Sequence, residues 1–150
     1  MSSTHPHREA GVGEHHLARL AEQAYERRGD YPALLYDGTW LSSAEIFDRA
    51  ARLGGGFASL GMKTGERVVV TMANCPEVSI VYQGLWRAGL VVTPATFLLP
   101  ALELRHVVAD SEASAVVTTP EFLPKVTEAV EGLPMTERAI NPFDDEITVN

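Results

Sequence analysis

Two valine-rich apolar runs, separated by one helix-length amphipathic segment, form the most regular pattern in the chain. The runs are residues 67–72 and 90–94, and residues 76–89 lie between them. Pro76 suits the first turn of a helix, where a missing N–H costs nothing, and Gly89 stands where helices commonly end. This order is typical of a β-α-β crossover between parallel, buried strands.

Strand and helix patterns continue to alternate after this unit. Residues 100–110 have helical spacing, residues 115–118 read Ala-Val-Val-Thr as a third strand, and residues 119–132 predict another helix with Thr119 in its cap. Residues 137–140 are a candidate fourth strand. Such alternation predicts a three-layer α/β fold, with a mainly parallel sheet, helices on both faces and right-handed crossovers.

The N-terminal part predicts a helix and then a hairpin. Apolar residues recur at helical spacing over residues 14–28, and Gly29 ends the pattern. They are Leu17, Leu20, Ala21, Ala24 and Tyr25. Residues 33–41 form a β-hairpin signal, because the Asp37-Gly38 pair fills a tight turn that needs positive φ. We expect this antiparallel hairpin to be added to the margin of the parallel sheet.

A second N-terminal helix begins directly after the hairpin. Ser42 and Glu45 have the spacing of a capping box, and Leu41 with Ile46 fits a hydrophobic staple. Glycines 54–56 interrupt this helix at roughly 1 kcal/mol each relative to alanine. A phosphate-cradling loop is one interpretation, but no strand precedes it and the spacing is not G-x-G-x-x-G. Close packing against a neighbouring element is favoured.

Composition limits the function classes. The chain has 150 residues, the length of one domain, and a net charge of −8, which repels nucleic acid phosphate. Lys63 and Lys125 are its two lysines, few for an enzyme that holds phosphates. Cys75 is the single cysteine, which excludes an internal disulfide and a cysteine-cluster zinc site. No apolar run has membrane-spanning length, and we expect a cytoplasmic protein.

Four patches, taken in order, resemble the N-terminal segment of the adenylate-forming enzymes, the acyl- and aryl-CoA synthetase family. Residues 41–46 resemble the family's Leu-Thr/Ser-Tyr-x-Glu-Leu motif, and residues 60–68 its Leu-Gly-x-x-x-Gly-Asp-Arg-Val turn. Residues 74–94 are similar to its Asn-x-x-Glu helix and Arg/Lys-Ala-Gly-x-x-x-x-Pro motif, and residues 110–113 to its Asp-Ser-x-Ala corner. The resemblance covers about residues 17–133.

The chain also departs from the family pattern. Ser43 stands where the family usually has Tyr, and residues 95–97 read Ala-Thr-Phe where Leu-Asn-Pro is usual. The triple glycine is unusual for its helix. These changes put substrate contacts near the loop after Pro94 in doubt, and they fit relaxed selection as well as specialisation.

The resemblance implies an ATP-dependent ligase that activates a carboxylic acid as an acyl-adenylate and passes it to a thiol, often that of CoA, as in fatty acid metabolism. That chemistry needs a Gly/Ser/Thr-rich phosphate loop, a carboxylate for Mg²⁺, an acid on the ribose and a lysine from a mobile C-terminal domain. The chain has no Ser/Thr-Gly-Thr/Ser-Thr/Ser-Gly run, and neither Lys63 nor Lys125 stands in the catalytic context. We therefore expect no catalytic, cofactor-binding or metal-binding residue in this chain.

Individual reactive residues give weaker signals. Cys75 precedes a helix N-terminus, where a thiol pKa can be depressed, but no histidine stands near it in sequence. The helix that begins at Pro76 could attract an anion by its dipole, without glycine or cation to support it. Trp40, Trp86 and Phe97 are interpreted as packing residues rather than base-stacking platforms, because no basic groups interleave with them.

The histidines and the acidic run near the C-terminus are candidates for metal binding. The histidines do not form a closed ligand set, and the acidic run 144–146 offers too few oxygens in register for Ca²⁺. The histidines are His5, His7, His15, His16 and His106. We interpret them as surface residues, and the acidic run as a solvated tail.

Two hypotheses remain for the whole chain. In the first, residues 1–13 are a loose lead-in, residues 14–140 are a partial N-terminal subdomain, and residues 141–150 are an acidic tail or truncation point. Its partner is then the remainder of the ligase or a complementing chain, and the chain alone is inactive. In the second, the chain is a stand-alone, non-catalytic α/β interaction module, with the apolar loop 97–99 as a docking patch. In the first case, an unpaired sheet edge predicts marginal stability or self-association of the isolated chain, whereas a sharp, monomeric melt would indicate a complete domain.

Overall fold

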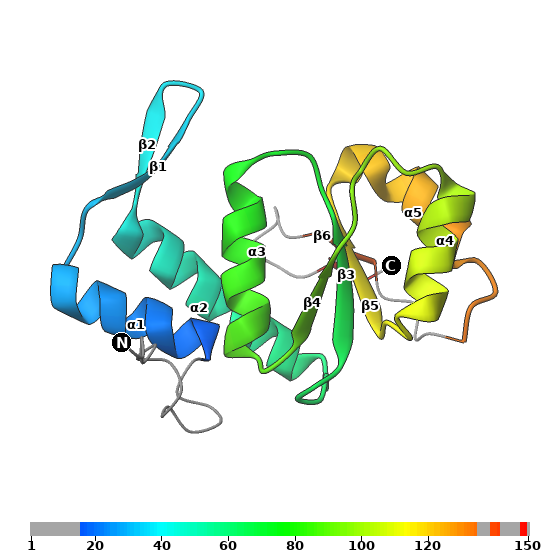
Figure 1. Ribbon diagram of the computed structural model, residues 1–150, viewed down its shortest axis with the longest axis horizontal. Coiled ribbons are helices and arrows are strands. Elements are labelled where there is room, and N and C mark those ends of the chain that lie inside the picture. Colours follow the sequence, from blue (N-terminus) through cyan, green and yellow to red (C-terminus); the bar gives the residue numbers. More distant parts are fainter. Residues whose placement is uncertain (1–15, 135–138, 142–147, 150) are drawn as a thin grey trace, which may run out of the picture.

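A five-stranded sheet with helices on both faces forms the larger part of the computed structural model, which describes residues 16–134, 139–141 and 148–149 (Figure 1). The strand order is β4-β3-β5-β6-β7, and a separate two-stranded sheet pairs β1 with β2. The predicted three-layer, mainly parallel α/β fold is confirmed.

The central crossover lies where the valine pattern places it. Strand β3 (Arg67–Thr71) leads into α3 (Pro76–Arg87), and β4 (Val91–Pro94) returns parallel to β3. Helix α4 (Ala101–Asp110) then carries the chain across the other face, so that β5 (Ala115–Thr118) pairs in parallel on the opposite side of β3. The connection after β3 runs to β4 on one side of it, whereas the connection after β5 runs to the other side, to the strand at residues 139–141. The carboxyl ends of β3 and β5 are therefore a topological switch point, where open α/β sheets bind ligands.

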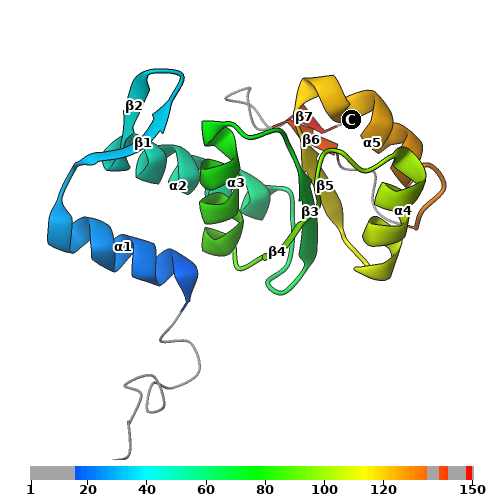
Figure 2. The same ribbon diagram turned by 45° about the horizontal axis from the view of Figure 1, so that its top comes forward.

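Alternate valines of β3 face two different cores. Val68 and Val70 pack with Phe57 of α2 (Ser43–Ser59) and Leu85 of α3 on one face of the sheet. Val69 packs on the other face with buried side chains of α4 and of α5 (Leu123–Val130). Figure 2 shows these two helices on the side of the sheet away from α3. A strand that is buried on both faces explains the unbroken valine run.

Strand β4 is less buried than the sequence predicts. It forms one edge of the described sheet, and Val91 is 47% exposed. The prediction of two fully buried strands is therefore wrong for β4, because a strand at an edge has one row of neighbours only. On the other side, β6 (Ala139–Asn141) pairs in parallel with β5, and β7 (Thr148–Val149) pairs antiparallel with β6.

The helix after β5 begins later than predicted. Thr119 makes no side-chain cap bond, and a short 3-10 turn, η1 (Pro120–Phe122), comes before α5. Thr119 is instead buried, at 2% exposure, at the carboxyl end of the sheet. Thr119 thus stands at the N-cap position of the short turn, with its carbonyl oxygen accepting from the Phe122 N–H, but its hydroxyl caps neither η1 nor α5.

The local signals of the N-terminal part are confirmed. Helix α1 (Leu17–Arg28) ends at Gly29, and β1 (Pro32–Tyr36) pairs antiparallel with β2 (Thr39–Ser42). Asp37 and Gly38 both have positive φ, at 46° and 74°, as a tight hairpin turn requires. The Ser42–Glu45 capping box is present in both directions.

The position predicted for the hairpin is wrong. It forms a sheet of its own rather than joining the margin of the parallel sheet. The inner residues Leu34 and Leu41 pack on Ile46 and Ile80, so the hairpin lies on the helical layer. The capping box explains this placement, because it starts α2 directly at the end of β2 and leaves no chain to carry the hairpin to the sheet.

The expected apolar face of α1 is also largely uncovered. Leu17 and Leu20 are 49% and 37% exposed, and Ala18 is the buried residue of this helix. Helical spacing predicted the element and the side that faces α2 and α3, where Ala21, Ala24 and Tyr25 are half-buried, but not how little of this side is covered.

The triple glycine allows close helix packing at one of its positions. A Cβ atom on Gly54 would lie 3.0 Å from the Gly84 carbonyl oxygen and 3.1 Å from Arg87 Cβ, whereas one on Gly55 would meet nothing within 4 Å. Gly84 in turn lies against Leu53. The packing interpretation of Gly54 is therefore confirmed: helices α2 and α3 cross at a pair of facing glycines.

Candidate functional site

The carboxyl end of the sheet is the first place to look for a site, because the switch point between β3 and β5 lies there. Thr71, Thr118 and Thr119 are buried at this end. The Thr118 hydroxyl donates to the Thr71 carbonyl oxygen at 2.9 Å. Among the described residues the hydroxyls of Thr71 and Thr119 have no hydrogen-bond partner. These groups can donate or accept a hydrogen bond, but they cannot exchange a proton near neutral pH.

A hollow of about 270 Å³ lies beside this end, between β3, β4 and α3. Its lining is Val70, Met72, Asn74, Val78, Tyr82, Pro94, Ala95, Thr96 and Phe97. Burial raises the pKa of Tyr82, which keeps its phenol protonated. The hollow therefore offers apolar contact and a few neutral polar groups, and it has no charged side chain that could bind a phosphate.

Cys75 is not an activated thiol in this structure. It stands at the N-cap of α3 and packs against the core on that face of the sheet. Burial raises its pKa, and the negative charge of Glu77 acts in the same direction, although backbone hydrogen bonds oppose them. The shift is opposite to the depressed pKa that a nucleophilic thiol needs.

The N-terminus of α3 already has a carboxylate of its own. Glu77 lies in the first turn, with its side chain 14% exposed, and accepts a hydrogen bond from Arg49 Nη2 at 2.9 Å. The helix dipole and Arg49 both stabilise this carboxylate. A second anion here would lie close to Glu77, which makes the start of α3 a poor anion site.

The other reactive residues occupy surface or packing positions. His16 and His106 are exposed, and no cluster of three or more metal-ligating side chains occurs among the described residues. His5, His7 and His15, and the acidic run 144–146, lie outside the described residues.

The aromatic residues pack against other rings or face solvent. Trp86 packs against Tyr82, with their ring centres 6.0 Å apart, and Trp40 is exposed on the hairpin. Neither arrangement forms a stacking platform between basic residues.

The apolar loop after β4 is only partly exposed. Phe97 stacks on Phe122 at 5.3 Å, and Leu99 packs against the core between α4 and α5. Lys125 donates to the Phe97 carbonyl oxygen and lies over the Phe122 ring, so it holds the loop. The expected patch of residues 97–99 is therefore reduced to Leu98, and Leu102 of α4 is exposed nearby in sequence.

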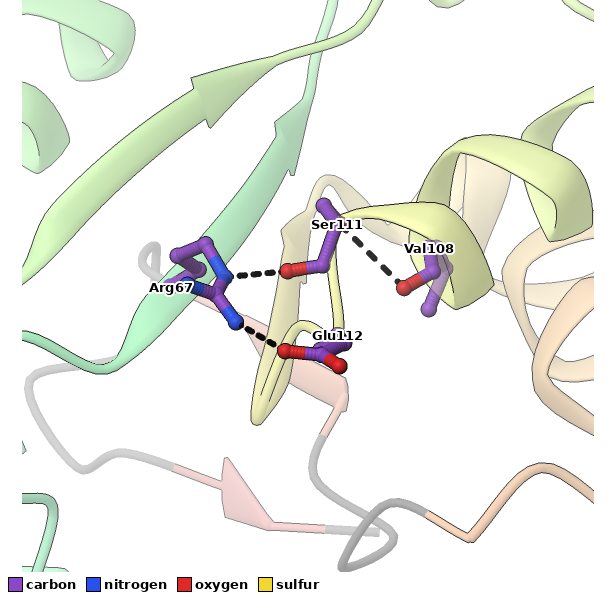
Figure 3. A network of polar contacts seen from close by, with 4 residues as sticks. All are labelled: Arg67, Val108, Ser111 and Glu112. Carbon is purple, nitrogen blue, oxygen red and sulfur yellow. Dashed lines mark hydrogen bonds and ion pairs between the residues drawn. The ribbon is translucent and has the colours of Figure 1, made fainter.

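Two arginines have structural roles that the sequence analysis missed. The first is Arg67, shown in Figure 3. Its Nε donates to the Ser111 carbonyl oxygen, and its Nη2 lies 2.5 Å from the Glu112 carboxylate. The Ser111 hydroxyl donates to the Val108 carbonyl oxygen at 3.2 Å, at the end of α4. Arg67 thus joins the beginning of β3 to the corner before β5.

The second is Arg87, at the C-terminal end of α3. Its side chain is 11% exposed, pairs with Glu22 of α1 at 2.6 Å and lies over the Phe47 ring at 4.2 Å. Its Nε and Nη2 atoms are buried and have no hydrogen-bond partner among the described residues. Both arginines lie within the family-like patches of residues 60–68 and 74–94, but only the fold shows what they contact.

Comparison with known proteins gives the class of protein. The AMP-binding enzyme family matches residues 20–148. A feruloyl-CoA synthase from Amycolatopsis sp is 34% identical over 116 residues, which cover 76% of this chain and 24% of that protein. A crotonobetaine/carnitine–CoA ligase from Salmonella paratyphi A is 30% identical over 129 residues, covering 81% and 24%.

Solved structures share the fold. A benzoate CoA ligase from Burkholderia xenovorans superposes with a TM-score of 0.75 at 24% identity, covering 83% of this chain and 25% of that one. The N-terminal subdomain of Klebsiella oxytoca NpsA gives 0.65 at 19% identity, covering 68% of this chain and 26% of that one.

The chain therefore belongs to the family of AMP-binding enzymes and corresponds to the N-terminal part of their AMP-binding domain. It spans about a quarter of the length of the curated relatives it matches. In the part of the chain that the structure describes, no helix is long and apolar enough to cross a membrane.

Proposed function

We propose that this chain is the scaffolding first part of an ATP-dependent ligase that activates a carboxylic acid as an acyl-adenylate and then forms a CoA thioester. The family match over residues 20–148, with relatives named as CoA ligases, carries the proposal. ATP, Mg²⁺ and CoA are the cofactors of the assembled enzyme, which acts in the cytoplasm. The proposal names the substrate only as a carboxylic acid, because the relatives are named for different acids, as feruloyl and crotonobetaine ligases.

The chain's own contribution is to hold the switch-point edge of the sheet in place. Arg67 ties β3 to the corner before β5, and Lys125 ties α5 to the loop after β4. The groups that bind pyrophosphate, Mg²⁺ and ribose come from the remainder of the ligase, either in one polypeptide or as a complementing chain. Residues 1–150 alone make no acyl-adenylate.

Segment replacement in a relative tests this proposal. Residues 20–148 of this chain replace the matched segment of the Amycolatopsis feruloyl-CoA synthase, and feruloyl-CoA formation is measured. The chimera is expected to form the thioester, because the replaced segment supplies support and not reacting groups. A matched chimera with Gly54→Val, which separates α2 from α3, is expected to lose both stability and activity. A folded, monodisperse first chimera without thioester formation would contradict the proposal.

A second candidate function is a stand-alone interaction module. Leu98 and Leu102 favour it, because they are 76% and 78% exposed and lie four residues apart at the β4–α4 turn. Such residues promote self-association. Sedimentation velocity of the purified chain, with Leu98→Ser as the test variant and Leu20→Ser as the control, distinguishes the cases. Dimers of the chain that Leu98→Ser alone abolishes would support the module; a monomer throughout would not.

A further inference from the structure

A groove of about 360 Å³ separates α1 from the helices it covers. The hairpin base closes one end, and α2 and α3 form the floor. Figure 1 shows how α1 lies relative to these elements. The lining of the groove includes Ala21, Ala24 and Tyr25 of α1, and the rings of Phe47, Tyr82 and Trp86 opposite them. Helix α1 thus spans an aromatic groove rather than packing directly on a core.

Few contacts hold α1 in this position. Ala18 is the buried residue of the helix, whereas Leu17 and Leu20 face solvent. The specific contacts are the Glu22 carboxylate on Arg87 at 2.6 Å and the Tyr25 ring stacked on Phe47 at 4.8 Å. A helix that buries little apolar surface opens locally at a lower free-energy cost than the core of the same protein.

The chain has a hinge directly after α1. Gly29 has φ +68°, and a Cβ atom there would meet nothing within 4 Å, so no neighbouring atoms crowd this residue. Its N–H donates to the Tyr25 carbonyl oxygen at 2.8 Å, within the end of α1, and its own carbonyl oxygen accepts a long bond of 3.4 Å from the Ser43 hydroxyl. The next residue is fixed, because the Asp30 carboxylate accepts from the Ala44 N–H at 3.0 Å and from the Ser43 hydroxyl at 3.1 Å. Tyr31 also exchanges hydrogen bonds with Ser43. Hydrogen bonds therefore fix the backbone from Asp30 onward, and α1 can move as a unit about Gly29.

The docked position leaves a polar group incompletely satisfied. Arg87 keeps one carboxylate partner, but its Nε and Nη2 donors are buried without an acceptor among the described residues. Unpaired buried donors lose their hydration without compensation. Arg87 is therefore a weak point of the docked arrangement, because α1 contributes one carboxylate to a guanidinium whose other buried donors have no acceptor among the described residues.

We propose that α1 is a detachable strap, which closes the aromatic groove on α2 and α3 and opens as a unit about Gly29. Its latch is the Glu22–Arg87 ion pair together with the Tyr25–Phe47 stack. Opening uncovers the groove floor, with Phe47, Tyr82 and Trp86, while the sheet and its two cores stay folded. The device does not depend on the ligase function proposed above.

Hydrogen exchange resolved by peptide tests the strap in the purified 150-residue chain. Amides of α1 are expected to exchange at least about tenfold faster than those of α3, through local opening. Glu22→Gln is expected to speed exchange in α1 about fivefold, the effect of losing about 1 kcal/mol, and to leave α3 unchanged. Glu26→Gln is the matched control, because Glu26 is an exposed carboxylate one turn further along α1.

Three results would overturn the strap. One is protection of α1 equal to that of α3 in the unsubstituted chain. Another is an equal effect of Glu22→Gln and Glu26→Gln, since the ion pair would then not be the latch. The third is faster exchange in α3 with Glu22→Gln, because α1 would then be part of the same cooperative unit as the sheet. Exchange in α3 also reports on global folding, so an unfolded variant is recognised directly.

Discussion

Different interactions hold two regions of the molecule. The sheet region consists of β3 to β7 with their covering helices, and the N-terminal region consists of α1 and the hairpin, up to the start of α2. In the sheet region, Val68, Val69 and Val117 are fully buried, and two helical layers cover the strands. In the N-terminal region, Ala18 is the buried residue of α1, and the cross-strand pair Leu35 and Trp40 of the hairpin is 55% and 56% exposed. The first region is held by burial on both faces, and the second by a small apolar cluster under the hairpin together with caps, a turn and a few polar contacts.

This difference separates what local sequence signals determine from what tertiary packing determines. A capping box and an Asp-Gly turn form wherever their few residues meet, so they define elements without tertiary support. Placing those elements requires apolar surface to bury, and the N-terminal region has little of it in this chain. We therefore expect substitutions in the sheet region to have large effects, and those in the N-terminal region to have small, local ones.

The largest contrast is expected between two leucines. Leu85 of α3 is fully buried, and Leu85→Ala should lower the free energy of unfolding by about 2–5 kcal/mol, because it removes apolar contact and leaves a cavity. Leu35→Ala on the hairpin should change it by less than about 0.5 kcal/mol. Urea unfolding followed by circular dichroism measures both, and equal losses would contradict the contrast.

The facing glycines give the next effect. Gly54→Ala is expected to cost about 1–3 kcal/mol, because its methyl group would press on the Gly84 carbonyl and the Arg87 side chain. Gly55→Ala, one residue further on, should instead stabilise by about 0.5–1 kcal/mol, because alanine is the better helix former and has open space there. Thermal melts of the two variants should therefore shift in opposite directions. A shift in the same direction would show that α2 and α3 do not pack at Gly54.

The capping box gives a smaller, local effect. Ser42→Ala should lower the free energy of unfolding by about 1 kcal/mol, because the Glu45 N–H loses its acceptor. Ser59→Ala removes a hydroxyl that bonds back to the Gly56 carbonyl at the other end of the same helix, and serves as the control. Its effect should be smaller, because no unpaired helix N–H is left behind. Chemical denaturation compares the two, and a larger loss at Ser59 would argue against the cap.

The smallest expected effect depends on pH. The backbone N–H of Ala44 lowers the pKa of Asp30, with smaller contributions from neighbouring hydroxyls. A carboxyl group whose folded pKa is lowered stabilises the fold above its ordinary pKa. This contribution is therefore lost below about pH 4, as the pH falls through the lowered value. Asp30→Asn should remove part of the pH dependence of the urea midpoint between pH 7 and pH 3. A midpoint that changes with pH as much in the variant as in the unsubstituted chain would contradict this contribution.

The sequence predicted elements better than their positions. The valine runs of β3 and β5 determined both strand and placement, since a strand buried on both faces leaves a pattern along the sequence. The exposed edge of β4, the separate hairpin and the uncovered face of α1 were missed, because each depends on which neighbour covers an apolar side chain.

The site was harder to predict than the fold. The direction of the Cys75 pKa shift depends on burial and on Glu77, and neither can be read from the residue before a helix. Arg67 and Arg87 lay within recognised motifs, but their partners Glu112 and Glu22 are distant in sequence. Ion pairs of this kind follow from the fold and leave no local pattern.

Formation of acyl-adenylate by the isolated chain is the most direct test of its role as scaffold. The purified 150-residue chain is incubated with ATP, Mg²⁺ and ferulate or benzoate, and exchange of labelled pyrophosphate into ATP is measured beside an intact feruloyl-CoA synthase. The account predicts no exchange above a protein-free blank. Exchange by this chain alone, abolished by heat denaturation, would place the reacting groups inside it and contradict the account.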